Sequence, residues 1–163
     1  MKILIAGLGS IGRRHFRNLK TLGENDLVLL RKNLSTLPDD ELRGYPVEND
    51  IDQALRNHKP DAVVIANPSS SHLEIAIPAA KAGCAILLEK PISDSLNGVS
   101  DLQTIAKENN APILVGFQFR YHPTLNKARE IIQQGGIGKV LAVHAHWGEY
   151  LPNWHPWEDY RQS

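Results

Sequence analysis

MKILIAGLGSIGRRHFR, residues 1–17, is the stretch that decides the fold of this chain. It begins with an almost wholly apolar run over residues 2–6, which predicts a strand buried on both faces, as in a parallel sheet. The glycine loop GLGSIG, residues 7–12, follows at once, and a helix is expected from about residue 11 to residue 22. The G-x-G-x-x-G spacing between a strand and a helix is typical of dinucleotide-binding domains.

Each residue of the glycine loop has its own expected role. Gly7 permits the tight turn after the strand, Gly9 lets a pyrophosphate approach the backbone, and Gly12 lets the helix pack closely on the strand. Ser10 and Ile11 open the helix, whose N-terminus offers unpaired N–H groups and the positive end of its dipole to phosphates. The loop therefore predicts a dinucleotide site, and the alternative is a glycine-rich turn that binds nothing.

Length and composition bound the class of protein. The chain has 163 residues, enough for one full domain with a sizeable core, and its 18 basic and 18 acidic residues give no net charge. That balance argues against nucleic acid and membrane surfaces as partners. The single cysteine, Cys84, excludes an intrachain disulfide and is expected in the core, and a cytoplasmic location is the default. No metal site is expected, because the histidines near the C-terminus lack carboxylate or cysteine partners at useful spacing.

The residues after the second expected strand, residues 27–30, bear on the choice of cofactor. An NAD site usually has an acidic residue about 20 positions beyond the glycine loop, where it binds the adenosine ribose. Here Arg31 and Lys32 stand there and no carboxylate does. Because a guanidinium attracts a 2′-phosphate and can bind it bidentately, the sequence favours NADP over NAD. The alternative is that Arg31 is merely solvated or stacks on the adenine.

The rest of the chain predicts a doubly wound α/β fold. Apolar runs at residues 62–66, 85–88 and 113–116 alternate with helical segments, which favours a mostly parallel Rossmann sheet with helices on both faces. One helix is expected over residues 95–108. The alternation at residues 140–147 predicts an antiparallel strand, the stub of a second domain. We expect a nucleotide-binding domain over residues 1–136 and the start of another over residues 137–163.

Polar residues follow two of these strands. Asn67 and Pro68 come after the strand at 62–66, and His72 lies in the next helix, where it either faces the nicotinamide half of the cofactor or caps and packs. Glu89 and Lys90 follow the strand at 85–88. Since the carboxyl ends of parallel strands form the ligand-binding edge, Lys90 is expected to donate to a substrate hydroxyl, with a surface salt bridge as the alternative. Gln118, after the strand at 113–116, completes the expected cofactor-binding residues.

The order GLGSIG, NPSSSH, EKP and GFQFRYHP resembles the glucose-fructose oxidoreductase / inositol dehydrogenase (Gfo/Idh/MocA) family. By that resemblance, the glycine loop cradles the pyrophosphate of NAD(P), and Asn67, Pro68 and His72 border the nicotinamide half. The resemblance also implies that Glu89 contacts the ribose and that Lys90 binds the reacting sugar hydroxyl and aids proton transfer.

The resemblance implies an NAD(P)-dependent dehydrogenase acting on a sugar-like or cyclitol substrate. Members of the family are considerably longer, and the antiparallel sheet of their second domain carries an Asp and a His that complete the catalytic group and often pairs subunits. This chain is therefore expected to be mainly the nucleotide-binding half of an enzyme that forms homo-oligomers. The alternative is a non-catalytic NAD(P)-binding module for redox sensing or assembly, which would not need Lys90.

Overall fold

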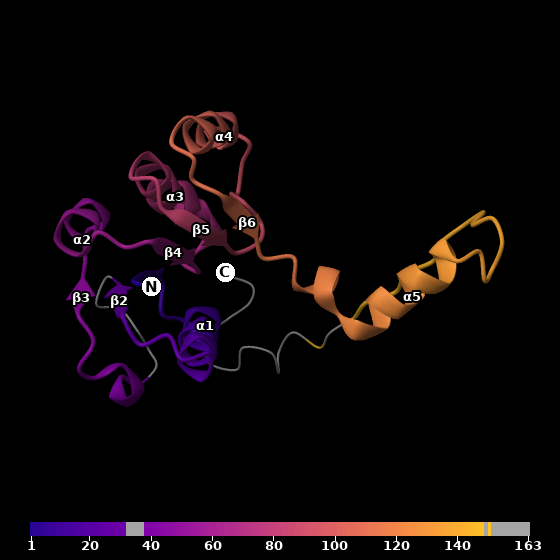
Figure 1. Ribbon diagram of the computed structural model, residues 1–163, viewed down its shortest axis with the longest axis horizontal. Helices are drawn as coiled ribbons and strands as arrows, with labels where there is room; N and C mark the ends of the chain where they lie inside the picture. Colours follow the sequence, from indigo (N-terminus) through magenta and orange to yellow (C-terminus); the bar gives the residue numbers. More distant parts are fainter. Residues whose placement is uncertain (32–37, 149, 151–163) are drawn as a thin grey trace. The chain divides into compact units, whose positions relative to one another are not determined.

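The computed structural model describes residues 1–31, 38–148 and 150, and the chain divides into two compact units, Met1–Phe117 and Gln118–Ser163. The first unit is built on a six-stranded sheet in the order β3-β2-β1-β4-β5-β6, in which every neighbouring pair is parallel (Figure 1). This is the predicted doubly wound α/β fold. The strands are β1 (Ile3–Ala6), β2 (Leu27–Leu30), β3 (Val47–Glu48), β4 (Ala62–Ile65), β5 (Ala85–Leu88) and β6 (Ile113–Val115).

Helices cover both faces of this sheet, as the sequence predicts. Figure 1 shows α1 on one side and α2, α3 and α4 together on the other. Three short 3-10 helices complete the described elements. The helices are α1 (Ser10–Thr21), α2 (Ile51–His58), α3 (His72–Lys81), α4 (Val99–Glu108) and α5 (Pro123–Gln133), with η1 (Asp40–Leu42), η2 (Ser69–Ser71) and η3 (Gln118–Tyr121).

The central strand β1 shows why the sheet forms. All four of its side chains are buried, because alternate residues enter two separate cores. Leu4 and Ala6 pack on the side of α2, α3 and α4, whereas Ile3 and Ile5 pack with Phe16 of α1 on the other. A strand with water on one face would alternate apolar and polar residues, so the continuous apolar run required this two-sided cover. Cys84 is buried too, as expected.

The topology brings the carboxyl ends of the strands to one edge. β1 pairs with both β2 and β4. The chain adds β2 and β3 on one side of β1 and then β4, β5 and β6 on the other, so the strand order switches between the neighbouring strands β1 and β4. In open α/β sheets, ligands bind in the crevice outside this switch point. The residues that follow β1, β2, β4 and β5 all lie along the same edge, and they include most of the predicted site.

Two expected elements differ in the structure. The helix predicted from residue 95 begins at Val99, because Gly98 has a φ of +80° and so cannot continue a right-handed helix. The antiparallel strand predicted over residues 140–147 is not formed: these described residues have no strand partner. A strand depends on a neighbour to bond its backbone, so the alternating pattern alone could not create it.

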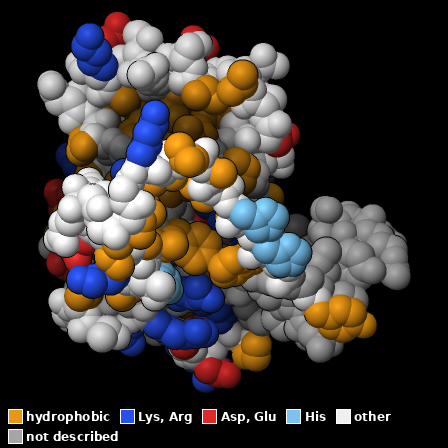
Figure 2. Space-filling model, turned by 90° about the vertical axis from the view of Figure 1, so that its right-hand side faces the viewer, with side chains coloured by type: hydrophobic (Ala, Val, Ile, Leu, Met, Phe, Trp, Pro, Cys, Tyr) orange, Lys and Arg blue, Asp and Glu red, His pale blue; other side chains and the backbone are white. Residues whose placement is uncertain are grey.

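In the second unit, the described residues form η3 and α5, and residues 139–148 after them are neither helix nor strand. Apolar side chains of this part are exposed, with Leu141 at 86% and Trp147 at 73% of their possible surface. Figure 2, turned by 90° from Figure 1, shows orange hydrophobic side chains at the surface of the described residues. Among the described residues, no helix is long and apolar enough to cross a membrane.

Because both faces of β1 are covered, shortening one of its side chains should strongly lower the free energy of unfolding. Leu4→Ala removes a fully buried side chain and should lower the free energy of unfolding by about 3 kcal/mol. The control is Leu114→Ala on β6, where the side chain is 53% exposed and the cost should stay below about 1 kcal/mol. Urea denaturation followed by circular dichroism measures both, and equal costs would contradict the assignment of the core.

Candidate functional site: a dinucleotide crevice at the sheet edge

Two glycines of the loop are required by the fold itself. Gly7 has a φ of +84°, and a Cβ there would lie 2.4 Å from the backbone nitrogen of Asn67. A Cβ on Gly12 would lie 1.8 Å from the carbonyl oxygen of Gly7. Both distances are far inside van der Waals contact. Gly7 therefore lets the segment after β4 approach the loop, and Gly12 lets α1 pack against the end of β1.

Gly9 is different, because nothing in the fold demands a glycine there. No described atom lies within 4 Å of a Cβ built on it, and its φ of −71° suits any residue. It is the N-cap of α1, and the first bond of the helix runs from the Arg13 N–H to the Gly9 carbonyl at 3.0 Å. The N–H groups of Ser10 and Ile11 therefore have no described acceptor and lie open at the positive end of the helix.

The end of β2 carries a charge network that sequence reasoning missed. Arg31 is engaged bidentately by Asp39, with 2.7 Å between Nη1 and Oδ1 and a second contact from Nη2 to Oδ2. Arg13, buried on α1, also donates to Oδ1 of Asp39 at 3.0 Å. Hydrogen bonds from Arg31, and to a smaller extent from Arg13, lower the pKa of Asp39 to about 2. Asp39 is therefore a carboxylate at neutral pH and offsets the positive charge predicted to select NADP.

The segment after β4 is held by its own side chains. His72 is buried, and its two ring nitrogens each lie 2.9 Å from a backbone carbonyl, Nε2 from that of Asn67 and Nδ1 from that of Pro91. This geometry favours the packing role that the sequence left open over contact with a nucleotide. Asn67 donates from Nδ2 to the Ser71 carbonyl at 3.0 Å, while its buried Oδ1 has no described partner. The backbone of Asn67 lies beside Gly7, so this residue stands next to the glycine loop.

The turn after β5 presents Glu89 and Lys90. The Glu89 carboxylate is half-buried and lies 2.8 Å from Nε2 of His15, a contact the sequence did not predict. Lys90 is exposed, and its ammonium has no ion-pair partner within the described ranges. The surface salt bridge considered from the sequence is therefore not formed there. An unpaired ammonium at the edge of the sheet is free to donate to a ligand.

The remaining predicted residues fall elsewhere. Lys32 lies outside the described residues, and Gln118 opens η3 in the second unit. Pro68 is the N-cap of η2, where it starts the turn toward α3. Asp39 and His15 contact predicted site residues but were not predicted from the sequence, because neither belongs to a recognisable motif. Their roles depend on which chain segments the fold brings together, which local sequence patterns do not report.

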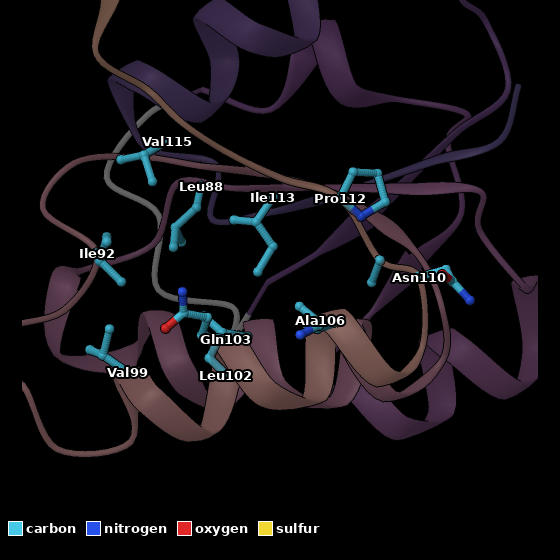
Figure 3. A pocket seen from close by; sticks show the side chains of 12 residues that line it. Leu88, Ile92, Val99, Leu102, Gln103, Ala106, Asn110, Pro112, Ile113 and Val115 are labelled. Atoms are coloured by element: carbon cyan, nitrogen blue, oxygen red, sulfur yellow. The ribbon is translucent and has the colours of Figure 1, made fainter.

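A cavity of about 720 Å³ lies away from this crevice (Figure 3). It is mostly apolar and runs between α4 and the strands β5 and β6, from Asn110 to Ile92. Leu88 and Ile113 line it from the sheet and Leu102 from the helix. None of the predicted site residues lines it, so the cavity is separate from the glycine loop.

Cys84 plays no part in the site. Its thiol donates to the Pro60 carbonyl at 3.1 Å, and burial raises the pKa of the thiol. A buried thiol that stays protonated is a poor nucleophile, which agrees with the expected core role.

The fold and the crevice together define a Rossmann-type dinucleotide-binding domain: a parallel sheet, a glycine loop at its switch point and an open helix N-terminus. A family model described as an oxidoreductase family with an NAD-binding Rossmann fold matches residues 1–117. The chain belongs to this family, Gfo/Idh/MocA, which confirms the resemblance seen in the motifs.

Several proteins with similar sequences or structures are named as inositol dehydrogenases. The chain is 32% identical over 145 residues to scyllo-inositol 2-dehydrogenase (NAD(+)) of Bacillus subtilis and 30% identical over 146 residues to myo-inositol 2-dehydrogenase of Thermotoga maritima; the matches cover 86% and 85% of this chain. A crystal structure of scyllo-inositol dehydrogenase from Lactobacillus casei, with bound NAD(H) and scyllo-inositol, superposes with a TM-score of 0.72 at 28% identity over 85% of the chain. The chain spans 42% of the length of each of these three proteins.

The open space at Gly9 gives a direct test of the crevice. Gly9→Ala places a methyl group where no described atom lies, so the free energy of unfolding should change by less than about 1 kcal/mol. The same methyl group would occupy the space for a pyrophosphate, and the dissociation constant for NADH should rise at least about tenfold. Isothermal titration calorimetry and thermal unfolding measure the two effects. Unchanged NADH affinity in a folded variant would show that no pyrophosphate binds at Gly9.

Proposed function

We propose that this chain is the nucleotide-binding part of an NAD(P)-dependent dehydrogenase that moves hydride between nicotinamide and a hydroxyl-bearing carbon of a sugar-like or cyclitol substrate. The observation that carries the proposal is the crevice itself. No described atom of the protein requires a glycine at position 9, so a ligand that approaches the backbone there would explain it. The exposed Lys90 ammonium lies on the same edge of the sheet. A domain that only held a nucleotide would have no need of that lysine.

The residues of the crevice fit a dinucleotide. The open N–H groups of Ser10 and Ile11 suit pyrophosphate oxygens, which carry negative charge and accept hydrogen bonds. Asn67, whose backbone lies beside Gly7, carries a buried Oδ1 that has no hydrogen-bond partner among the described residues. When bound, the nicotinamide supplies a hydride acceptor or donor, which protein side chains cannot provide. The protein contributes alignment and control of the alcohol proton.

Lys90 is the residue we propose for the substrate hydroxyl. An ammonium has three N–H donors and no acceptor, so it hydrogen-bonds a hydroxyl oxygen and stabilises the negative charge that develops as the hydroxyl loses its proton. Flanking contacts hold the turn that carries it: Glu89 is bound by His15, and the carbonyl of Pro91 by His72. A carboxylate or imidazole elsewhere in the protein would take the proton.

The substrate class follows from the relatives rather than from this crevice. Proteins of related sequence carry names of inositol dehydrogenases, so a cyclitol is the first substrate to try. We also propose that the protein forms homo-oligomers, which agrees with the exposed apolar side chains of the second unit, such as Leu141 and Trp147.

The choice between NAD and NADP rests on Arg31 and Asp39. We propose that the Arg31 guanidinium can bind the 2′-phosphate of NADP, and that Asp39 weakens this binding because it already occupies the guanidinium. Both Nη atoms of Arg31 are bound to Asp39, which stays ionised at neutral pH. A 2′-phosphate must displace this carboxylate or face its repulsion, whereas the ribose hydroxyls of NAD can donate to it.

Asp39→Asn should therefore shift the cofactor preference. Losing the negative charge frees Arg31 for the phosphate, and the ratio of NADPH to NADH affinity should rise about tenfold. Asp40→Asn is the matched control, because Asp40 is the neighbouring carboxylate but pairs with the exposed Arg43 instead. Calorimetric titration with both nucleotides checks the ratio. If Asp39→Asn and Arg31→Ala both leave the ratio unchanged, these residues do not select the cofactor.

Lys90→Ala should separate catalysis from nucleotide binding. In the whole protein, turnover of myo-inositol or scyllo-inositol should fall by about 10² to 10⁴, because the variant no longer stabilises the developing alkoxide. The dissociation constant for NADH should change by less than about threefold. Steady-state kinetics and NADH fluorescence titration measure the two quantities, with Lys107→Ala on α4 as the control. Full turnover in Lys90→Ala would favour the non-catalytic module.

A further inference from the structure

His15 and Glu89 form a contact between the dinucleotide helix and the turn that carries Lys90. His15 lies on α1, one turn beyond the glycine loop, and Glu89 follows β5. Nε2 of His15 is 2.8 Å from Oε1 of Glu89, and the two side chains are 21% and 20% exposed. A contact between groups this well covered restricts both side chains more than a fully exposed ion pair would.

The Glu89 carboxylate accepts hydrogen bonds from two directions and lies close to the end of β6. His15 reaches Oε1 from α1, and the backbone N–H of Lys90 donates to Oε2 at 3.3 Å. The carboxylate also lies close to Gly116 after β6: a Cβ built on Gly116 would be 3.2 Å from Oε2, so a larger residue there would press on the carboxylate. The position of the carboxylate therefore satisfies α1 and its own turn at once, in the space that the glycine at position 116 leaves open.

The chemistry of the pair assigns the donor. An ionised carboxylate has only acceptor oxygens, so the imidazole must donate from Nε2–H whether the ring is neutral or charged. A hydrogen bond to a charged partner is shorter and stronger than one between neutral groups. His15 therefore supplies a directional bond that a hydrophobic residue of similar size would not replace.

The turn is also held on its other side. The Pro91 carbonyl is bound by His72 at the start of α3, so imidazoles from two helices fix the residues on either side of Lys90. His72 ties the turn to the segment after β4, whereas His15 ties it to α1, the helix that the glycine loop opens. The His15 contact therefore bears on the distance between α1 and the turn that carries Lys90, whereas the His72 contact does not.

We propose that His15 is a positioning residue of the dehydrogenase. By holding Glu89, it fixes the turn that carries Lys90 relative to the N-terminus of α1, and so sets the spacing between the pyrophosphate subsite and the nicotinamide subsite. The inference rests on the proposed function, since it assumes that a dinucleotide spans this edge. It predicts that loss of the contact weakens binding of the nicotinamide half selectively and leaves the adenosine diphosphate half unaffected.

Two substitutions at one position test this proposal. His15→Asn is too short to reach Glu89 with its amide, whereas His15→Gln places an N–H close to the position of Nε2. NADH and ADP-ribose, which lacks the nicotinamide, are titrated by calorimetry. We expect His15→Asn to raise the dissociation constant for NADH about tenfold and that for ADP-ribose less than about twofold. His15→Gln should restore NADH binding to within about threefold of the original protein.

His58 offers a matched control. Its Nε2 also lies 2.8 Å from a glutamate oxygen, Oε1 of Glu48, and the side chains are 20% and 16% exposed. This pair joins α2 to β3, away from the turn after β5. His58→Asn therefore removes a similar contact and should leave both nucleotide affinities unchanged.

The outcomes separate the inference from the proposed function. If His15→Asn weakens NADH and ADP-ribose equally, or weakens neither, the positioning role is wrong while nucleotide binding stands. Failure of His15→Gln to rescue, or an equal effect of His58→Asn, also overturns the role. If the unaltered protein binds neither ligand, the proposed function fails and the inference fails with it. Thermal unfolding of each variant confirms that the affinities belong to folded protein.

Discussion

The close approach of α1 to the end of β1 is the constraint on which the rest of the site depends. The position of Gly12 leaves no room for a Cβ against the Gly7 carbonyl, so the helix axis is set against the strand with little freedom. That placement directs the helix N-terminus to the switch point of the sheet. It also carries His15, one turn later, to the level of the strand ends.

The consequence is a crevice built from two kinds of contact. Backbone N–H groups at the start of α1 form the part that suits phosphates, and their position depends on the glycine loop and the sheet. Side-chain pairs form the rest: Arg31 with Asp39 at one strand end, and His15 with Glu89 at another. The first part is common to dinucleotide domains in general. The second part determines which charges a ligand at this edge would meet.

The Arg31–Asp39 pair shows how local sequence can mislead about charge. Arg31 stands where many NAD sites have a carboxylate, and by itself it favours a 2′-phosphate. The fold returns a carboxylate to that place from eight residues further along the chain, and two arginines hold it ionised. The net charge at the end of β2 therefore depends on which carboxylate the fold brings against Arg31, and not on the strand end alone.

By itself the sequence determined the sheet, the position of the glycine loop and the EKP turn, because apolar periodicity and glycine spacing are local properties of the chain. It also placed Cys84 in the core. It did not determine the partners of Arg31, Glu89 and His72, or that α4 begins at Val99, because these depend on backbone geometry and on segments distant in the chain. The strand expected at residues 140–147 failed for the same reason: a strand needs a neighbour, and only tertiary structure decides whether one is present.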